Sequence, residues 1–164
     1  RGQAEQEQDL ISEVSDAATS RRRELLDLAQ ADADAYAAVV AARRLPRDGE
    51  PAGERSQRIG AATRQATLVP LRTAEAAAAV LELSARIAPV GNRNAVSDVG
   101  VAAQLASASV RAAVLNVRIN LPGLPADDGV RRDAAARAEE LWGSVVRREA
   151  DVVALVTRRM ATTT

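Results

Sequence analysis

The sequence contains no cysteine, histidine, lysine or phenylalanine, so its 22 basic residues are all arginines, and they balance 22 acidic residues. A metal site built on imidazole or thiolate ligands, a Cys or His nucleophile and a lysine Schiff base are therefore excluded within this chain. Proton transfer is left to carboxylates, to the single tyrosine, Tyr36, to the backbone or to water.

An excess of charge of either sign is also missing. The formal net charge is zero, whereas a domain that binds nucleic acid normally carries a basic excess. No apolar run approaches the roughly 20 residues of a membrane span, and no signal peptide opens the chain. Because the chain has no cysteine, it needs no oxidising compartment. We therefore expect a soluble, cytoplasmic protein whose partner is a small molecule or a protein, and neither nucleic acid nor a membrane.

Aromatic residues make up 1% of the sequence, whereas 37 of its 164 residues are alanines. Alanine has the highest intrinsic helix propensity, which favours an all-α domain. Apolar residues recur at three- and four-residue steps between clusters of Pro, Gly and Asn, and this pattern predicts four long helices. The expected ranges are 6–44, 54–87, 97–120 and 130–160.

The short connections between these helices predict an antiparallel helical bundle, as a single domain over residues 1–164. Pro70 lies inside the second helix, where it removes one backbone hydrogen bond, so we expect a kink or a break there. Asn94 and Ser97 are both suitable N-caps for the third helix.

One carboxylate lies on the apolar stripe of the first predicted helix. At about 100° per residue, Asp32 falls within roughly 40° of Leu28 and Tyr36, whereas Asp34 falls on the opposite, solvated side. A partly buried carboxylate has a raised pKa, which suits general acid or base chemistry near neutral pH. The alternative is that the small alanines around Asp32 leave room for water at the edge of the bundle, with no chemistry involved.

A polar seam runs along the third predicted helix. At about 100° per residue, Ser109, Asn116 and Asn120 fall within roughly 40° of Asp98, while Arg118 points to solvent or to another subunit. The adjoining stripe, which we expect to face the core, consists of Val101, Leu115 and Ile119. Because buried amide side chains need partners, the seam indicates either hydrogen bonds between helices or a polar ligand.

The turn before this helix contains Asn92, Arg93 and Asn94, and its backbone N–H groups near a helix N-terminus suit an anion or a carbonyl.

The basic run 21–23 is interpreted as a solvated face, because helical rotation spreads it around the axis and no aromatic residue lies within it. Trp142, the only tryptophan, is interpreted as an anchor in the core or at an interface.

Five short segments follow one another between residues 25 and 122. They are Ala31–Val40, Arg44–Pro46, Val69–Leu71, Gly91–Ala103 and Asn116–Leu121. This series resembles the successive signatures of the formiminotetrahydrofolate cyclodeaminase and methenyltetrahydrofolate cyclohydrolase family. The resemblance implies an all-helical fold, a homodimer or higher homo-oligomer, a tetrahydrofolate derivative bound in a polar cleft between helices, and no metal.

The resemblance also implies that the catalytic acid is Asp32, four residues before the aromatic position at Tyr36. Where the family often carries another acid, this chain has Gln30. Family members usually open with a Pro- and Gly-rich loop and an Ala-rich helix, and neither precedes Arg1. We therefore expect a bundle that lacks the family's N-terminal helix.

The activity that the resemblance implies is ring closure of 5-formiminotetrahydrofolate to 5,10-methenyltetrahydrofolate with release of ammonia. Asp32 would move the protons, Asp98, Asn116 and Asn120 would hold the pterin or the amidine, and Arg93 or Arg118 would meet the glutamate tail. One alternative is a methenyltetrahydrofolate cyclohydrolase, which yields 10-formyltetrahydrofolate. The other is a non-catalytic helical dimerisation module.

Overall fold

The computed structural model describes residues 2–46 and 53–162, and over these residues the chain forms four long helices and no strand. The long helices are α1 (Gln3–Arg44), α2 (Glu54–Ile87), α3 (Val96–Asn120) and α4 (Gly129–Ala161), and the 3-10 turns η1 (Arg93–Ala95) and η2 (Leu121–Gly123) flank α3. The predicted all-α fold is confirmed, and every predicted helix range agrees with the structure to within three residues. Because α2 continues through Pro70, the proline does not break this helix.

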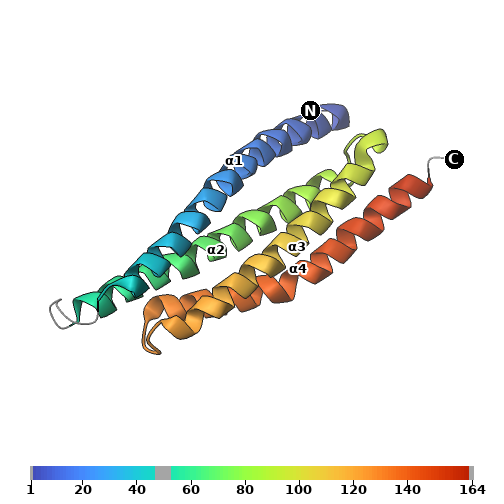
Figure 1. Cartoon of the computed structure of the whole chain (residues 1–164). Coiled ribbons are helices and arrows are strands. Elements are labelled where there is room, and N and C mark those ends of the chain that lie inside the picture. Colours follow the sequence, from blue (N-terminus) through green and yellow to red (C-terminus); the bar gives the residue numbers. More distant parts are fainter. Residues whose placement is uncertain (1, 47–52, 163–164) are drawn as a thin grey trace.

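Successive helices run antiparallel, and Figure 1 shows α1 along one side of α2 with α3 and α4 beyond it. The main core lies between α2, α3 and α4, where side chains such as Leu81, Val110 and Val145 are fully buried. The helix α1 packs principally against α2, through a smaller cluster that includes Leu28 and Val69. The bundle is therefore open on the side between α1 and α3.

The N-terminus of α3 is capped differently from the sequence expectation. The N-cap of α3 is Ala95, which has no capping side chain, so the predicted caps Asn94 and Ser97 are wrong. The Oδ1 of Asn92 instead accepts the backbone N–H of Asn94 at 2.9 Å and caps the short turn η1. A 3-10 turn therefore precedes α3, and it moves the helix start past Asn94.

The N-terminus of α4 is held by Asp128. Its Oδ1 accepts the backbone N–H of Val130 at 2.8 Å, and its Oδ2 accepts a hydrogen bond from Arg64 of α2 at 2.9 Å. Burial raises the pKa of Asp128, but the hydrogen bonds from Arg64 and Val130 and the charge of Arg64 outweigh it, so this pKa lies below its ordinary value of 3.8. The ionised carboxylate therefore connects α2 to the start of α4.

Several apolar side chains that were expected in the core are exposed. On α3, Val101, Leu115 and Ile119 are 53%, 54% and 79% exposed, so the prediction that they face the core is wrong. Tyr36 of α1 is exposed as well. Periodicity identifies an apolar face of a helix, but it does not tell what covers that face.

The expectation that no apolar stretch approaches the length of a membrane span is wrong by composition, because the segment 93–123, which contains α3, is long and apolar enough to cross a membrane by length and composition alone. The core helix of a water-soluble protein passes the same test, and Val110, Val114 and Val117 of α3 are fully buried against the other helices. The apolar character of α3 therefore comes from two faces, one buried in the core and one exposed.

Candidate active site

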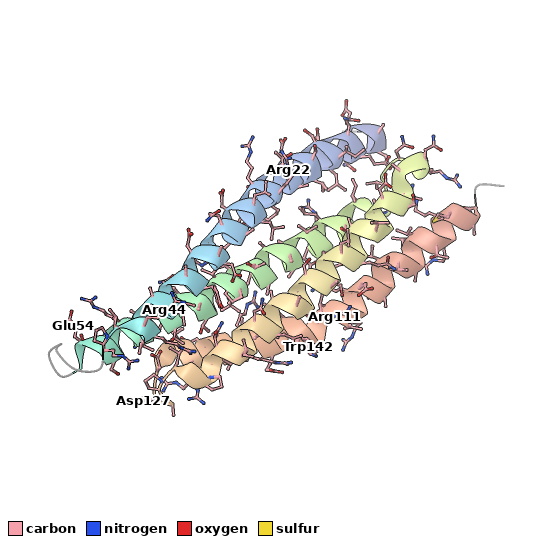
Figure 2. The ribbon with its side chains drawn as sticks, in the orientation of Figure 1. Arg22, Arg44, Glu54, Arg111, Asp127 and Trp142 are labelled. Atoms are coloured by element: carbon pink, nitrogen blue, oxygen red, sulfur yellow. The ribbon has the colours of Figure 1, made fainter. Side chains whose placement is uncertain are left out.

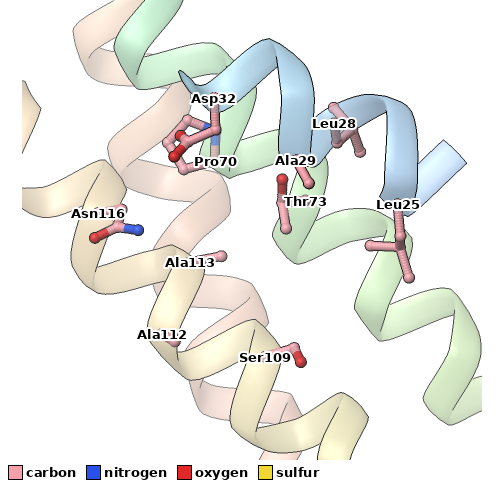
Figure 3. Close-up of a pocket in the computed structure, with 10 residues that line it drawn as sticks. All are labelled: Leu25, Leu28, Ala29, Asp32, Pro70, Thr73, Ser109, Ala112, Ala113 and Asn116. Carbon is pink, nitrogen blue, oxygen red and sulfur yellow. The ribbon is translucent and has the colours of Figure 1, made fainter. Parts of the chain in front are cut away.

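A groove with two adjoining cavities lies on the open side of the bundle, between α1 and α3 and above α2 (Figure 3). Their volumes are about 370 Å³ and about 470 Å³, within the range of small-molecule sites. The first is lined by Leu25, Leu28, Ala29, Asp32, Pro70, Thr73, Ser109, Ala112, Ala113 and Asn116. The second is lined by Asp32, Tyr36, Val39, Arg43, Ala66, Asn116, Ile119 and Asn120. Asp32 and Asn116 line both cavities, so they lie where the two meet.

Asp32 lies on the α1 wall of this groove, above Pro70 of α2 and across from Asn116 of α3 (Figure 3). Its helix position was predicted from periodicity, but its side chain is exposed rather than partly buried, because none of the helices in residues 2–46 and 53–162 covers the mouth of the groove. Asp34 is also exposed and accepts a hydrogen bond from Gln30 at 3.0 Å, on the solvated side as predicted. Of these two acids, only Asp32 lines the groove.

Pro70 explains how Asn120 is held. Proline has no N–H, so the carbonyl of Ala66, four residues earlier in α2, loses its helical donor. The Nδ2 of Asn120 donates to the Ala66 oxygen at 2.7 Å and to the Asn116 carbonyl at 2.9 Å. Both amide hydrogens are thereby used, which leaves Oδ1 as the group that Asn120 offers to the cavity. For Asn120, the expected hydrogen bond between helices is therefore confirmed.

Asn116 differs from Asn120, which follows it by one helical turn. Within the described ranges, its side-chain amide has no hydrogen-bond partner in the protein, and it lines both cavities. An amide offers donors and an acceptor together, so Asn116 is suited to a polar ligand group beside Asp32.

Hydroxyl groups also line the first cavity. Ser109 donates to the Leu105 carbonyl at 2.8 Å, and Thr73 donates to the Val69 carbonyl at 3.1 Å, each four residues back along its own helix. Because their hydrogens are used in this way, both oxygens remain as acceptors toward the cavity.

Sequence reasoning missed two groove residues, Thr73 and Arg43. Arg43 lies 11 residues after Asp32, and at about 100° per residue the two side chains point within roughly 20° of the same direction. Helical periodicity therefore predicts that Arg43 lies on the same face of α1 as Asp32. At about 1.5 Å per residue it lies roughly 16 Å along α1 from Asp32. Among the described residues, Arg43 is the positively charged side chain that lines the groove.

The remaining sequence candidates do not line either cavity. They are Asn92, Arg93, Asn94, Asp98 and Arg118. Asp98 lies in the first turn of α3, about 27 Å along the helix from Asn116. Arg93 donates to the carbonyl of Thr162 at 2.7 Å, at the C-terminal end of α4. The structure thus does not bring these residues together with Asp32.

Arg118 lies on the other side of α3, toward α4. Its guanidinium stacks 4.5 Å from the centre of the Trp142 ring and donates to Glu139 at 2.8 Å. Trp142 packs against the edge of the main core. Figure 2 shows Trp142 beside α4 and Arg22 projecting outward from α1, which agrees with a solvated position for Arg22.

No metal site is evident in the parts of the chain that the structure describes, since no group of three or more acidic, His or Cys side chains is placed to hold an ion there. The groove instead combines one carboxylate, two amides, three hydroxyls, one of them the phenol of Tyr36, and one guanidinium with an apolar wall. Such a set is suited to binding a flat, polar organic molecule and to moving a proton at one point along it.

Comparisons with known proteins show which family the chain belongs to. The family model described as formiminotransferase-cyclodeaminase matches residues 1–140. The chain is 38% identical to methenyltetrahydrofolate cyclohydrolase of Methylorubrum extorquens over 134 residues, which cover 81% of this chain and 62% of that protein. It is 35% identical to formimidoyltransferase-cyclodeaminase of Rattus norvegicus over 105 residues, or 63% of this chain and 19% of that protein.

The protein of the same name from Sus scrofa is 35% identical over 118 residues, which cover 71% of this chain and 22% of that protein. The chain thus spans less than two thirds of the length of the relatives that it matches. The family model, in contrast, covers most of the chain and includes the whole groove. The chain therefore belongs to the formiminotransferase-cyclodeaminase family.

Proposed function

We propose that the groove binds a tetrahydrofolate derivative and that Asp32 moves protons at the carbon between its N5 and N10 atoms. The observation that carries this proposal is the position of Asp32, which faces Asn116 at the junction of the two cavities. The relative from Methylorubrum extorquens supports the substrate class, because its name, methenyltetrahydrofolate cyclohydrolase, describes an enzyme that acts on a tetrahydrofolate derivative.

The lining of the groove fits the parts of a folate. The amide of Asn116 and the Oδ1 of Asn120 match the donors and acceptors of a pterin, and Leu25 and Leu28 offer apolar surface to a flat ring. Arg43, at the far end of the second cavity, would meet the glutamate carboxylates. This assignment replaces Arg93 and Arg118 as the candidates for the tail.

We propose hydrolysis of 5,10-methenyltetrahydrofolate as the first candidate reaction. A water molecule attacks the bridging carbon, Asp32 accepts a proton from that water, and the resulting tetrahedral carbon carries a hydroxyl group. The bond from this carbon to N5 then breaks, N5 takes up one proton, and the hydroxyl loses its proton as the formyl group forms on N10. One proton is released in total. The higher identity and longer match to the cyclohydrolase favour this reaction.

Cyclodeamination is the second candidate, and it uses the same groups. N10 of protonated 5-formiminotetrahydrofolate attacks the formimino carbon, and Asp32 accepts the N10 proton. Asp32 then delivers the proton to the amino group, which leaves as ammonia while the methenyl cation forms. The similarity to the mammalian cyclodeaminases favours this reaction.

The two reactions are distinguished by following the absorbance of 5,10-methenyltetrahydrofolate with each substrate, while ammonia is measured in parallel. A cyclohydrolase consumes the absorbance and releases no ammonia, whereas a cyclodeaminase produces the absorbance and ammonia in equal amounts. If the chain processes neither substrate and calorimetry detects no tetrahydrofolate binding, the proposal is wrong and a non-catalytic dimerisation module becomes the better interpretation. We also propose a cytoplasmic location and a homodimer or higher homo-oligomer.

A further inference from the structure

We propose that Pro70 is a positioning residue for the ligand. By leaving the Ala66 carbonyl without its helical donor, Pro70 fixes the Asn120 amide with its oxygen toward the groove, where that oxygen accepts an N–H of the ligand. The identity of the ligand, a tetrahydrofolate derivative, rests on the proposed function. The new element is that a side chain without any polar atom sets the direction of a hydrogen bond to the ligand.

Pro70 is buried in the middle of α2 and lies at the floor of the first cavity, beneath Asp32 (Figure 3). A proline inside a helix affects the carbonyl four residues earlier in two ways, because it supplies no N–H to that carbonyl and its ring presses against it. Here the carbonyl belongs to Ala66, which lines the second cavity. The effect of the proline is therefore felt one helical turn away, in the neighbouring cavity.

The Asn120 side chain takes the place of the missing helical donor. Its Nδ2 lies 2.7 Å from the Ala66 oxygen and 2.9 Å from the backbone oxygen of Asn116. If the amide turned over, its oxygen would face these two carbonyl oxygens, and two hydrogen bonds would be replaced by contacts between acceptors. The surroundings therefore fix the amide, and its oxygen is the end that faces the second cavity.

The side chain of Asn116 provides the contrast within the same groove. Its amide makes no hydrogen bond within the residues that the structure describes, so nothing there fixes which end faces a ligand. Asn116 can match either a donor or an acceptor of the ligand, whereas Asn120 matches a donor only.

Three other side chains in the groove offer acceptors as well. Ser109 and Thr73 each donate to a carbonyl of their own helix, which leaves their oxygens as acceptors, and an ionised Asp32 only accepts. A ligand edge rich in N–H groups satisfies such a set, whereas an edge rich in carbonyl oxygens is repelled by it. A tetrahydropterin ring has N–H groups of this kind, in its amino group and at its reduced ring nitrogens. The fixed direction of the Asn120 amide is thus part of the specificity of the groove.

The first test is a double-mutant cycle on the full chain, read out as the Kd of tetrahydrofolate by calorimetry. Pro70→Ala returns the N–H of residue 70 to the Ala66 carbonyl, so we expect binding to weaken about threefold to tenfold, the value of one hydrogen bond. We expect Asn120→Ala to weaken it by a similar factor. The double variant should bind within about twofold of Asn120→Ala, because the proline acts through Asn120. The matched control is Pro125→Ala, a proline outside the groove, which should change Kd less than about twofold.

The second test uses Asn120→Asp, for which the effect of the proline should reverse. In the presence of Pro70, the new carboxylate cannot donate to the Ala66 carbonyl and is repelled by it. When Pro70→Ala is added, the N–H of residue 70 satisfies that carbonyl, and the carboxylate can accept from the ligand. Pro70→Ala should therefore strengthen tetrahydrofolate binding by the Asn120→Asp chain about threefold or more, the opposite of its effect on the wild-type chain. Circular dichroism and thermal melting check that each variant folds.

The third test needs no ligand. In nuclear magnetic resonance of the ¹⁵N-labelled chain, the side-chain amide hydrogens of Asn120 should exchange with solvent about tenfold more slowly than those of Asn116, and Pro70→Ala should remove most of this difference. Equal exchange at the two amides in the wild-type chain would overturn the fixed orientation.

The outcomes separate this inference from the proposed function. If the wild-type chain binds tetrahydrofolate but Pro70→Ala has the same effect with and without the Asn120 side chain, or the same sign in the Asn120→Asp chain, the inference is wrong and the proposed function stands. If the wild-type chain binds no tetrahydrofolate, the proposed function is wrong, and the ligand assigned to Asn120 is wrong with it.

Discussion

Replacement of Asn120 by alanine tests the way in which α2 tolerates its internal proline. The Asn120 amide donates at 2.7 Å to the Ala66 carbonyl, whose helical donor is missing because residue 70 is proline. An unsatisfied buried carbonyl costs about 1–3 kcal/mol. Because Ala66 lines the second cavity, removal of the Asn120 side chain would open its carbonyl to water from that cavity, so we expect the lower end, about 1 kcal/mol in the free energy of unfolding.

A double-mutant cycle in urea separates this hydrogen bond from other effects of the substitution. In a Pro70→Ala background the backbone N–H of residue 70 returns to the Ala66 carbonyl, so Asn120→Ala should then cost less than about 0.5 kcal/mol. Asn116→Ala is the control, since its amide makes no bond within the described ranges and its loss should stay within about 0.5 kcal/mol. Equal losses for Asn120→Ala in both backgrounds would refute the link between Asn120 and Pro70.

Two further predictions concern charged residues. In a steady-state assay, Arg43→Gln should raise the KM for a folate substrate about threefold to tenfold and leave kcat unchanged, because Arg43 is exposed and its charge is partly screened. The control is Arg44→Gln, at the next position but outside the groove, which should change neither KM nor kcat. Asp128→Asn should lower stability to urea at pH 7, and the difference from wild type should shrink as the pH falls below 3.8, the ordinary pKa of the group, because the pKa of Asp128 is lowered in the folded state and its protonation there removes the contribution. A difference between Asp128→Asn and wild type that stays constant as the pH is lowered from 7 to well below 3.8 would contradict the ionic role of Asp128.

The helices were predictable because strong local signals mark them. The loop around Gly53 and the turn at Pro89 and Gly91 interrupt long Ala-rich segments, and helix propensity decides the structure between such breaks. The direction of Asp32 was predictable for the same reason, since rotation along a continuous helix fixes it relative to Leu28.

Periodicity does not predict which element, if any, packs on the apolar face of each helix. Val101 and Ile119 lie on an apolar stripe, as predicted, but none of the four long helices that the structure describes packs on that stripe, and both side chains are exposed. The role of Asn120 depends on a carbonyl 54 residues away that Pro70 leaves without a donor, and only the packing of α3 on α2 brings these groups together. The side chain of Arg118 stacks on Trp142 of α4, and the sequence of α3 alone does not predict this contact between helices.

The central claim is that Asp32 transfers the protons in a folate-binding groove. Asp32→Asn keeps the shape of the side chain and removes the base, so kcat on the active one-carbon substrate should fall by about 10²- to 10⁴-fold. Binding of tetrahydrofolate by calorimetry and the thermal midpoint should change little, because the side chain is exposed. Asp34→Asn, two residues later on the opposite side of α1, is the matched control and should retain wild-type turnover. A fully active Asp32→Asn variant, or equal losses in Asp32→Asn and Asp34→Asn, would contradict the account.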